Sequence, residues 1–287
     1  MRRSCLALHL TAALLLSSPF HLATAAPAAN AAASAATPLV IGESFNIDSR
    51  ALKEKRHINV YMARAWDTPP DAPLPVLYMP DGGVAEDFLH VAGLLQVSVA
   101  NGTMRPFMLV GMQNTQRRRD LTGPTENAQD RKIAPVVGGS QAYRAFIRDE
   151  LMPEVKRRYR TTGETAIVGE SLAGLFVVET YLLEPQLFDH YLAFDPSLWW
   201  NHGALPREAA ALLAKGKPGK RDLYLASSSE AGIAVEVQRL ADVLDKQAPS
   251  GLQWHVEKMP EESHGTIYHP AALKAFRAVF KPATPPQ

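Results

Sequence analysis

Two side chains that could carry out nucleophilic chemistry stand far apart in this sequence. Ser171 lies in the stretch IVGESLAG (167–174), where an apolar run gives way to a helical pattern. A serine hydroxyl attacks a carbonyl carbon efficiently only when a base takes its proton. His264, in the SHG stretch near the C-terminal end, is the candidate for that base. The pair predicts acyl-transfer chemistry if the fold brings the two residues together.

The residues around Ser171 nearly match Gly-x-Ser-x-Gly, a turn that exposes a serine at the end of a strand. Gly169 fills the first small position, and Ala173 adds one methyl group where a second glycine is usual. Small residues there keep the following helix clear of the strand. Serine is also a favoured helix N-cap residue. The motif alone therefore leaves both a nucleophile and a structural cap open.

The order of residues along the chain favours His264 as the base. Enzymes with this turn carry the serine, then the acid, then the histidine after the last strand. His264 follows the expected strand 252–260 and meets that requirement. An ordinary loop histidine is the alternative. His269 is the rival base, but it precedes Pro270 at the start of an expected helix, which favours a structural role.

The third member of such a site is a carboxylate that orients the imidazole. Glu230, at the end of the expected strand 222–230, is the first choice. Asp195, at the end of the preceding strand, is the rival, and Glu236 is a weaker third candidate. The sequence leaves the choice open, so the acid is the least certain member.

Short β-rich runs alternate with helical patterns along the whole chain. Strands are expected at 58–65, 75–83, 106–114, 164–171, 191–197, 222–230 and 252–260. Helices are expected between them, including 85–99, 140–159 with a kink at Pro153, and 270–280. This alternation predicts an α/β protein with a mostly parallel central sheet. Chemistry in such sheets sits at the carboxyl ends of the strands.

The N-terminal residues predict export. Residues 1–25 show the basic, apolar and small-residue succession of a signal peptide. Residues 26–37 are expected to be a flexible leader, and 38–283 a single catalytic domain. Cys5, the one cysteine, falls within the signal peptide, so no disulfide is expected. We expect a periplasmic or secreted protein without a membrane anchor.

The charge balance argues against nucleic acid as a partner. Removing Arg2 and Arg3 with the signal peptide reduces the 30 basic residues to 28, against 29 acidic ones. A near-neutral chain does not predict the broad basic surface that a phosphate backbone requires. Metal-ligand spacings, phosphate loops and dinucleotide fingerprints are missing from the sequence, so we expect no metal and no cofactor.

Six stretches, in order, resemble a known family. They are PVLYMPDGG (75–83), VGMQNTQRRRDLTGPT (110–125), GGSQAYRAFIRDELMPEVKRRY (138–159), GESLAGLF (169–176), FDPSLWWN (194–201) and SHGTIYHPA (263–271). The chain resembles the esterase family that includes esterase D, mycolyltransferases, feruloyl esterases and enterochelin esterases, and most of all its periplasmic siderophore esterases. The combination of Asn-Thr-x-Arg-x-Arg-Asp-Leu-Thr with Pro-Ser-Leu-Trp-Trp-Asn is the most specific part.

The resemblance implies an α/β-hydrolase fold, a three-layer αβα sandwich around the parallel sheet. It implies Ser171 as nucleophile and His264 as base. It also implies an oxyanion hole formed by the backbone N–H groups of Leu172 and Gly83. The alternative is that Gly83 and its neighbours only form a turn. A turn could also supply the oxyanion-hole donor, so the two interpretations are compatible.

Three residues depart from the family pattern. They are Ala173, Glu170 beside the serine, and Asp195, where a small residue is usual. A negative charge on Glu170 would discourage highly anionic substrates. Asp195 could have taken over the acid role from Glu230, and a site that works with a Ser-His pair alone is a third option.

Four residues are candidates for substrate binding. Trp199 and Trp200 follow a strand, and we expect at least one of them to line the substrate pocket. There its indole could contact an aromatic or acyl group of the substrate. Arg117 and Arg119 lie in the long loop 115–138 and could bind an ester that carries a carboxylate or catecholate. Alternatively, Arg119 pairs with the adjacent Asp120 and only fixes the loop.

These features together predict a serine carboxylesterase that acts on a small-molecule ester through an acyl-enzyme on Ser171. A siderophore lactone of the enterobactin type is the favoured substrate. A feruloyl or acetyl esterase, or an acyltransferase of the same fold, is one alternative. A binding protein on a non-catalytic hydrolase scaffold is another.

Overall fold

The computed structural model describes residues 36–216 and 219–282. The chain divides into one unit that ends at Val40 and a second that runs from Ile41 to Gln287. The expected signal peptide and most of the expected leader lie outside the described residues, so both stay predictions. The fold and the site described below belong to the second unit.

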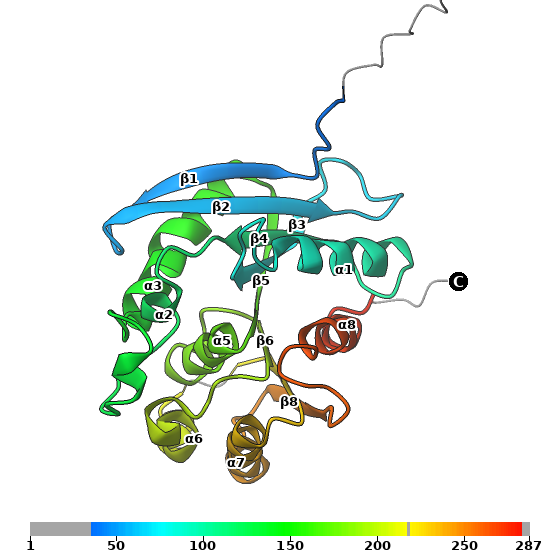
Figure 1. Cartoon of the computed structure of the whole chain (residues 1–287). Coiled ribbons are helices and arrows are strands. Elements are labelled where there is room, and N and C mark those ends of the chain that lie inside the picture. Colours follow the sequence, from blue (N-terminus) through cyan, green and yellow to red (C-terminus); the bar gives the residue numbers. More distant parts are fainter. Residues whose placement is uncertain (1–35, 217–218, 283–287) are drawn as a thin grey trace, which may run out of the picture. The chain divides into compact units, whose positions relative to one another are not determined.

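Eight strands form one sheet in the order β1-β2-β4-β3-β5-β6-β7-β8 (Figure 1). Their bounds are β1 (Glu43–Ser49), β2 (Glu54–Ala63), β3 (Leu74–Pro80), β4 (Phe107–Met112), β5 (Thr161–Glu170), β6 (His190–Phe194), β7 (Arg221–Ser227) and β8 (Leu252–Lys258). β2 pairs antiparallel with β1 and with β4, and the other neighbours are parallel. The predicted α/β fold with a mostly parallel sheet is confirmed. β1 is an additional edge strand that the sequence analysis did not include.

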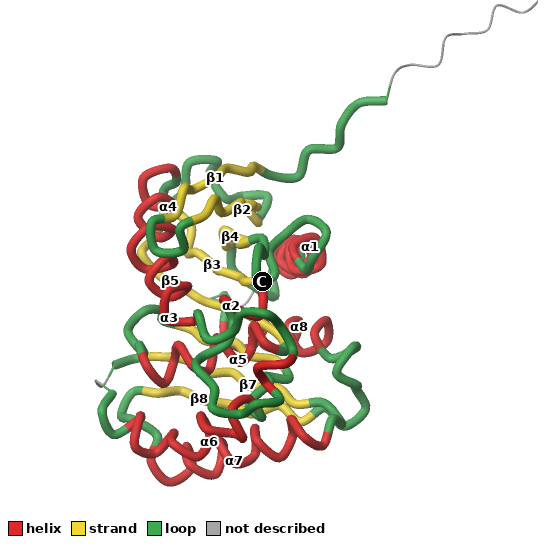
Figure 2. Tube along the Cα trace, turned by 60° about the vertical axis from the view of Figure 1, so that its left-hand side comes forward, coloured by secondary structure: helices red, strands yellow, loops and turns green. Residues whose placement is uncertain are grey.

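Helices cover both faces of this sheet (Figure 2). Their bounds are α1 (Phe88–Ala100), α2 (Arg117–Asp120), η1 (Asp130–Lys132), α3 (Ser140–Phe146), η2 (Ile147–Leu151), α4 (Met152–Arg158), α5 (Leu172–Leu183), α6 (Trp200–Leu213), α7 (Ala231–Gln247) and α8 (Tyr268–Val279). Buried side chains of α1 and α8 form one core layer with the sheet, and those of α3 to α7 form the other. The expected three-layer arrangement follows from these two cores.

The helix expected over 140–159 is one run with an irregular middle. η2 is a π-helical turn between α3 and α4, and Pro153 lies in the first turn of α4. Proline has no backbone N–H to donate, and its ring collides with the carbonyl four residues earlier. Regular α-helical hydrogen bonding therefore cannot pass through this position, which explains the predicted kink.

The central strands hold the candidate site rigidly. All residues of β3 and β4 are buried, as expected for parallel-sheet strands covered on both faces. α5 is buried from Leu172 to Leu182 and packs directly behind β5. The carboxyl ends of β3, β5, β6, β7 and β8 share one edge of the sheet, because these strands run parallel.

Candidate active site

Ser171 stands on a sharp turn between β5 and α5. Its backbone has φ +60° and ψ −120°, a strained combination for a residue with a side chain. A Cβ atom at Gly169 would lie 2.6 Å from the carbonyl carbon of Ala173. Glycine is therefore required at 169, and the methyl group of Ala173 fits. Ser171 makes no side-chain capping hydrogen bond to α5, so the local geometry is that of a nucleophile elbow.

His264 lies on the loop between β8 and α8 and faces this serine. Its Nε2 atom is 3.1 Å from Ser171 Oγ, although the two residues are 93 positions apart. That separation is within reach for proton transfer. The rival histidine, His269, instead has its Nδ1 atom 3.1 Å from Nε2 of His90. The order of residues along the chain favoured His264 over His269 as the candidate base, and in the structure His264 is the one of the two that contacts Ser171.

Asp195, directly after β6, lies on the other side of the imidazole. Its Oδ2 atom is 2.7 Å from His264 Nδ1, and its side chain is fully buried. Ser228 donates its backbone N–H to Oδ1 and its hydroxyl to Oδ2, both at 2.7 Å. With three donors on the carboxylate, the charged form is stabilised in the interior.

Glu230, the first choice for the acid, does not lie against the imidazole. It is exposed at the start of α7, and its carboxylate makes no hydrogen bond with His264 among the described residues. Glu236 pairs with Arg239, 2.6 Å away on the same helix. Of the two candidate acids, the structure therefore places Asp195, and not the preferred Glu230, against the imidazole. The physical reason is the strand order, which puts β6 between β5 and β7, so that a residue following β6 emerges next to the elbow.

The electrostatics of Asp195 and His264 reinforce each other. Burial alone would raise the pKa of Asp195, but the hydrogen bonds from His264 and Ser228 outweigh it and hold that pKa below its usual value. The hydrogen bond to Asp195 raises the pKa of His264 against the opposing effect of burial. The buried carboxylate thus favours the imidazolium that forms when a histidine accepts a proton.

One of the two expected oxyanion-hole donors is already engaged. Gly83, beyond the end of β3, donates its backbone N–H to Glu86 Oε2 at 2.7 Å. The same carboxylate accepts a longer hydrogen bond from the backbone N–H of Asn114. The turn at Gly82 packs directly against β4, where a Cβ atom would lie 2.3 Å from the backbone, so only glycine fits there. Leu172 opens α5 directly after the nucleophile.

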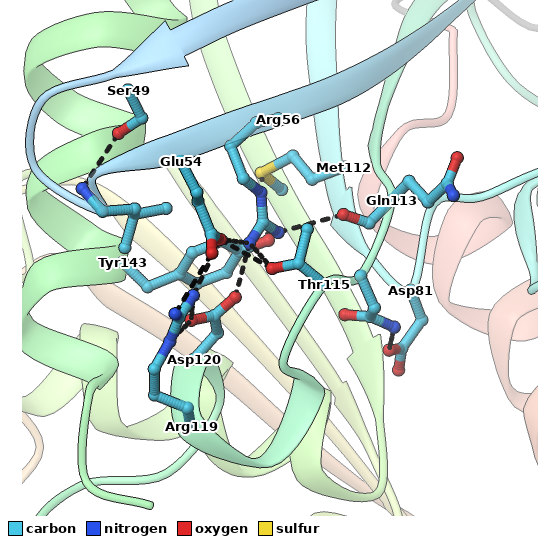
Figure 3. A network of polar contacts seen from close by, with 12 residues as sticks. Ser49, Glu54, Arg56, Asp81, Met112, Gln113, Thr115, Arg119, Asp120 and Tyr143 are labelled. Atoms are coloured by element: carbon cyan, nitrogen blue, oxygen red, sulfur yellow. Dashed lines mark hydrogen bonds and ion pairs between the residues drawn. The ribbon is translucent and has the colours of Figure 1, made fainter. Parts of the chain in front are cut away.

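The arginines of the long loop are paired with carboxylates. Arg117 makes two hydrogen bonds to Asp81, of 2.7 and 2.8 Å, and keeps about a third of its side chain exposed (35%). Arg119 binds Glu54 at 2.8 Å and Asp120 at 2.6 Å. Figure 3 shows Arg119 pointing into this network. These contacts are those expected from the alternative, in which Arg119 fixes the loop, and its substrate-binding role stays a prediction.

The same network contains a buried arginine. Arg56 on β2 is fully buried and donates to Asp120 at 2.6 Å, to Thr115 at 2.8 Å and to the Gln113 carbonyl at 3.0 Å (Figure 3). Its guanidinium group connects β2 to the loop after β4. Charges buried in this way are costly unless they are paired, so the loop conformation depends on the whole network.

The two tryptophans have different surroundings. Trp200 is buried and donates its indole N–H to the Gly123 carbonyl at 3.0 Å, so it belongs to the core. Trp199 is exposed over 39% of its surface. The expectation that at least one lines a pocket therefore rests on Trp199 alone.

Three polar residues of this region were not recognised from the sequence. Ser228 supports Asp195, Glu86 engages Gly83, and the Ser197 hydroxyl lies 3.5 Å from Ser171 Oγ. The run SSSE (227–230), which begins with the last residue of β7, was the signal for Ser228, since small hydroxyl residues at a strand's carboxyl end can hydrogen-bond to a neighbouring site. Ser197 and Glu86 had no comparable signal.

Residues 36–216 and 219–282 contain no cluster of three or more His, Cys, Asp or Glu side chains placed to hold a metal ion. Over the same ranges, every helix is too short or too polar to cross a bilayer.

The strand order and the elbow after β5 together define an α/β-hydrolase. The family model described as "Putative esterase" matches residues 49–264. The chain belongs to this esterase family.

Relatives and solved structures agree with this assignment. The ferri-bacillibactin esterase BesA of Bacillus subtilis is 29% identical over 168 residues, which are 52% of this chain and 56% of BesA. The siderophore triacetylfusarinine C esterase of Aspergillus fumigatus is 33% identical over 163 residues, 50% of this chain and 51% of that protein. The chain thus spans about half the length of the curated relatives it matches. An IroE-like serine hydrolase from Shewanella oneidensis superposes with a TM-score of 0.74 and 29% identity, covering 83% of this chain and 80% of that structure.

Proposed function

We propose that the protein is a serine carboxylesterase with Ser171 as nucleophile, His264 as general base and Asp195 as the acid. The observation that carries this proposal is one continuous chain of contacts. Ser171 Oγ lies 3.1 Å from His264 Nε2, and His264 Nδ1 lies 2.7 Å from Asp195 Oδ2. Membership of the esterase family supports the reaction class.

The geometry suits a two-step reaction. Ser171 Oγ bonds to the ester carbonyl carbon while its proton moves to His264 Nε2. The tetrahedral intermediate then expels the alkoxide, which takes that proton and leaves as the alcohol. Water attacks the acyl-enzyme by the same route and releases the carboxylic acid and free serine. Asp195 keeps the imidazole in the required tautomer and stabilises the imidazolium in both steps.

The negative charge on the carbonyl oxygen needs donors. We assign this role to the backbone N–H groups of Leu172 and Gly83, and one such donor contributes about 3 kcal/mol to transition-state stabilisation. Because Gly83 N–H is bound to Glu86, the Glu86 carboxylate has to move away before the second donor can act.

For the substrate, we propose a siderophore ester. The similar proteins of Bacillus subtilis and Aspergillus fumigatus carry siderophore substrates in their names. A groove of about 420 Å³ runs along the arginine loop, between residues 116–119 and 134–136. Its lining combines Arg117, Arg118 and Arg119 with the apolar Pro135 and Val136, a composition that suits an aromatic acyl group bearing negative charge. We further propose export to the periplasm or the medium, on the N-terminal sequence pattern.

A fluorophosphonate probe tests the mechanism. We expect the wild type to be labelled, Ser171→Ala to lose the label, and Ser250→Ala, an exposed serine in the turn before β8, to keep it. A wild type that resists the probe would support the alternative of a binding protein.

Substrate profiling tests the substrate class. Rates on p-nitrophenyl esters, feruloyl esters and enterobactin are measured with and without an added alcohol. Hydrolysis of short plain esters with none of enterobactin would remove the siderophore proposal, and ester products with the alcohol would indicate an acyltransferase.

A further inference from the structure

The imidazole of His264 faces two carboxyl groups with the same nitrogen. Asp195 Oδ2 lies 2.7 Å from Nδ1, and Glu170 Oε1 lies 3.3 Å from it. Glu170 is the last residue of β5 and directly precedes the candidate nucleophile. The side chain before Ser171 therefore turns back to the far side of the imidazole.

The two carboxyl groups differ in how well they are satisfied. Both oxygens of Asp195 accept hydrogen bonds from Ser228. Glu170 Oε1 is shielded from solvent and, among the described residues, has no hydrogen-bond donor with good geometry. A buried carboxyl oxygen without a donor costs stability. Glu170 Oε1 lies 3.3 Å from His264 Nδ1. In the proposed reaction the imidazole gains and loses a proton, so a charge at this position would act on the base.

We propose that Glu170 is a positioning residue: a second carboxyl group beside His264 Nδ1 that acts through its charge, next to the hydrogen bond to Asp195, and sets the pH range in which the imidazole acts as a base. This inference rests on the proposed esterase function. It concerns the histidine, so it can be tested separately from ester hydrolysis.

The surroundings of Glu170 make it able to change charge near neutral pH. Burial raises its pKa to about 7, against the attraction of His264 and of Arg117 from α2. Asp195 and Asp81, at the ends of β6 and β3, repel its charge and act in the same direction as burial. Tyr268 of α8 is also close enough for the Glu170 charge to help raise the pKa of its hydroxyl.

The sign of the effect follows from these charges. When Glu170 is ionised, two negative groups face Nδ1, and the Glu170 charge is one of the causes that raise the pKa of His264. When Glu170 is protonated, Asp195 remains as the hydrogen-bonded carboxylate, and the Glu230 charge at the start of α7 still helps to raise the pKa of His264. The two groups therefore titrate as a pair rather than independently. Removing the Glu170 charge should lower the pKa of His264 and leave the neutral base available at lower pH.

The experiment follows His264 directly by NMR, from the pH dependence of its imidazole carbon and nitrogen shifts. In Glu170→Gln we expect the His264 midpoint to fall by about one unit. The acid limb of the pH profile for fluorophosphonate labelling should move in the same direction. The matched control is Glu261→Gln, an exposed carboxylate on the same loop as His264, which should leave the midpoint unchanged. If Glu170→Gln does not fold, Glu170→Asp withdraws the oxygen from Nδ1 and should shift the midpoint in the same direction.

A second comparison uses Asp195→Asn. Its labelling rate should exceed that of the Asp195→Asn, Glu170→Gln double variant by about tenfold, roughly 1.4 kcal/mol. Equal rates, or a His264 midpoint unchanged within about 0.2 unit in Glu170→Gln, would overturn the inference. Labelling of Ser171 without a midpoint shift rejects the Glu170 role and keeps the esterase proposal. If the His264 midpoint shifts in Glu170→Gln but the wild type resists the probe, the Glu170 role is supported and the esterase proposal is rejected.

Discussion

Asp195 meets His264 from the end of β6, with Oδ2 2.7 Å from Nδ1. Its backbone leaves the strand with φ +43°, and its N–H donates to the Ala226 carbonyl on β7 at 2.8 Å. The turn after β6 is therefore tied to the neighbouring strand, which also supplies Ser228. This arrangement holds the carboxylate rigidly behind the imidazole.

The first prediction compares two carboxylates. Asp195→Asn should lower kcat for ester hydrolysis on the order of 10³-fold, because the histidine loses the partner that fixes its tautomer. Glu230→Gln should stay within about twofold, since its carboxylate is exposed and does not contact His264. Steady-state kinetics at matched protein stability measures both. A larger loss in Glu230→Gln than in Asp195→Asn would return the acid role to Glu230.

The second prediction concerns Glu86. Its carboxylate occupies the Gly83 N–H at 2.7 Å, where the substrate oxyanion is expected to bind. Glu86→Ala should therefore raise kcat/KM severalfold, roughly 1 kcal/mol of transition-state stabilisation. Glu86→Gln keeps a neutral acceptor, so its kcat/KM should lie between those of the wild type and Glu86→Ala. If Glu86→Ala instead lowers kcat/KM, the carboxylate shapes the loop rather than blocking it.

The third prediction tests the close packing of the elbow. In Gly169→Ala the new methyl group would lie 2.6 Å from the Ala173 backbone, and β5 and α5 are too buried to move apart. We expect a loss of about 2 kcal/mol in the free energy of unfolding, the usual cost of overpacking. The control is Gly232→Ala on α7, where a Cβ atom meets nothing within 4 Å. Alanine favours the helix there, so equal losses in the two variants would contradict the packing argument.

The fourth prediction concerns stability at alkaline pH. His190 lies between Asp222 and Glu164, at 2.6 and 2.8 Å. Burial lowers its pKa, but the hydrogen bonds to the two carboxylates outweigh burial and raise that pKa to about 9. Because the folded-state pKa is raised, this stabilisation is complete below the unfolded value near 6.5 and is lost as the pH rises through 9.

Urea unfolding at pH 6 and pH 9.5 measures this contribution. The wild type should lose roughly 1–3 kcal/mol more than His190→Gln between these pH values. His255→Gln, at an exposed histidine on β8 that pairs with Glu257, is the control and should behave like the wild type. The same pH dependence in His190→Gln and wild type would rule out the proposed role of the cluster.

Much of the architecture could be predicted because it depends on local pattern. Alternating strands and helices predicted the parallel sheet, and the structure confirms it. Pro153 predicted the irregular helix for a purely local reason. β1 was missed because it is an edge strand in which only Ser49 is fully buried, so its sequence carries little hydrophobic signal.

The sequence by itself determined which residue types stand at the strand ends and in what order, and this was enough to single out Ser171 and His264. Only the tertiary structure placed Asp195, and not Glu230, in contact with His264, left Trp199 exposed while burying Trp200, and paired Arg119 with Glu54. Contacts of this kind join residues tens of positions apart, 69 in the case of His264 and Asp195. Their geometry depends on strand order and turn conformation, which no local pattern specifies.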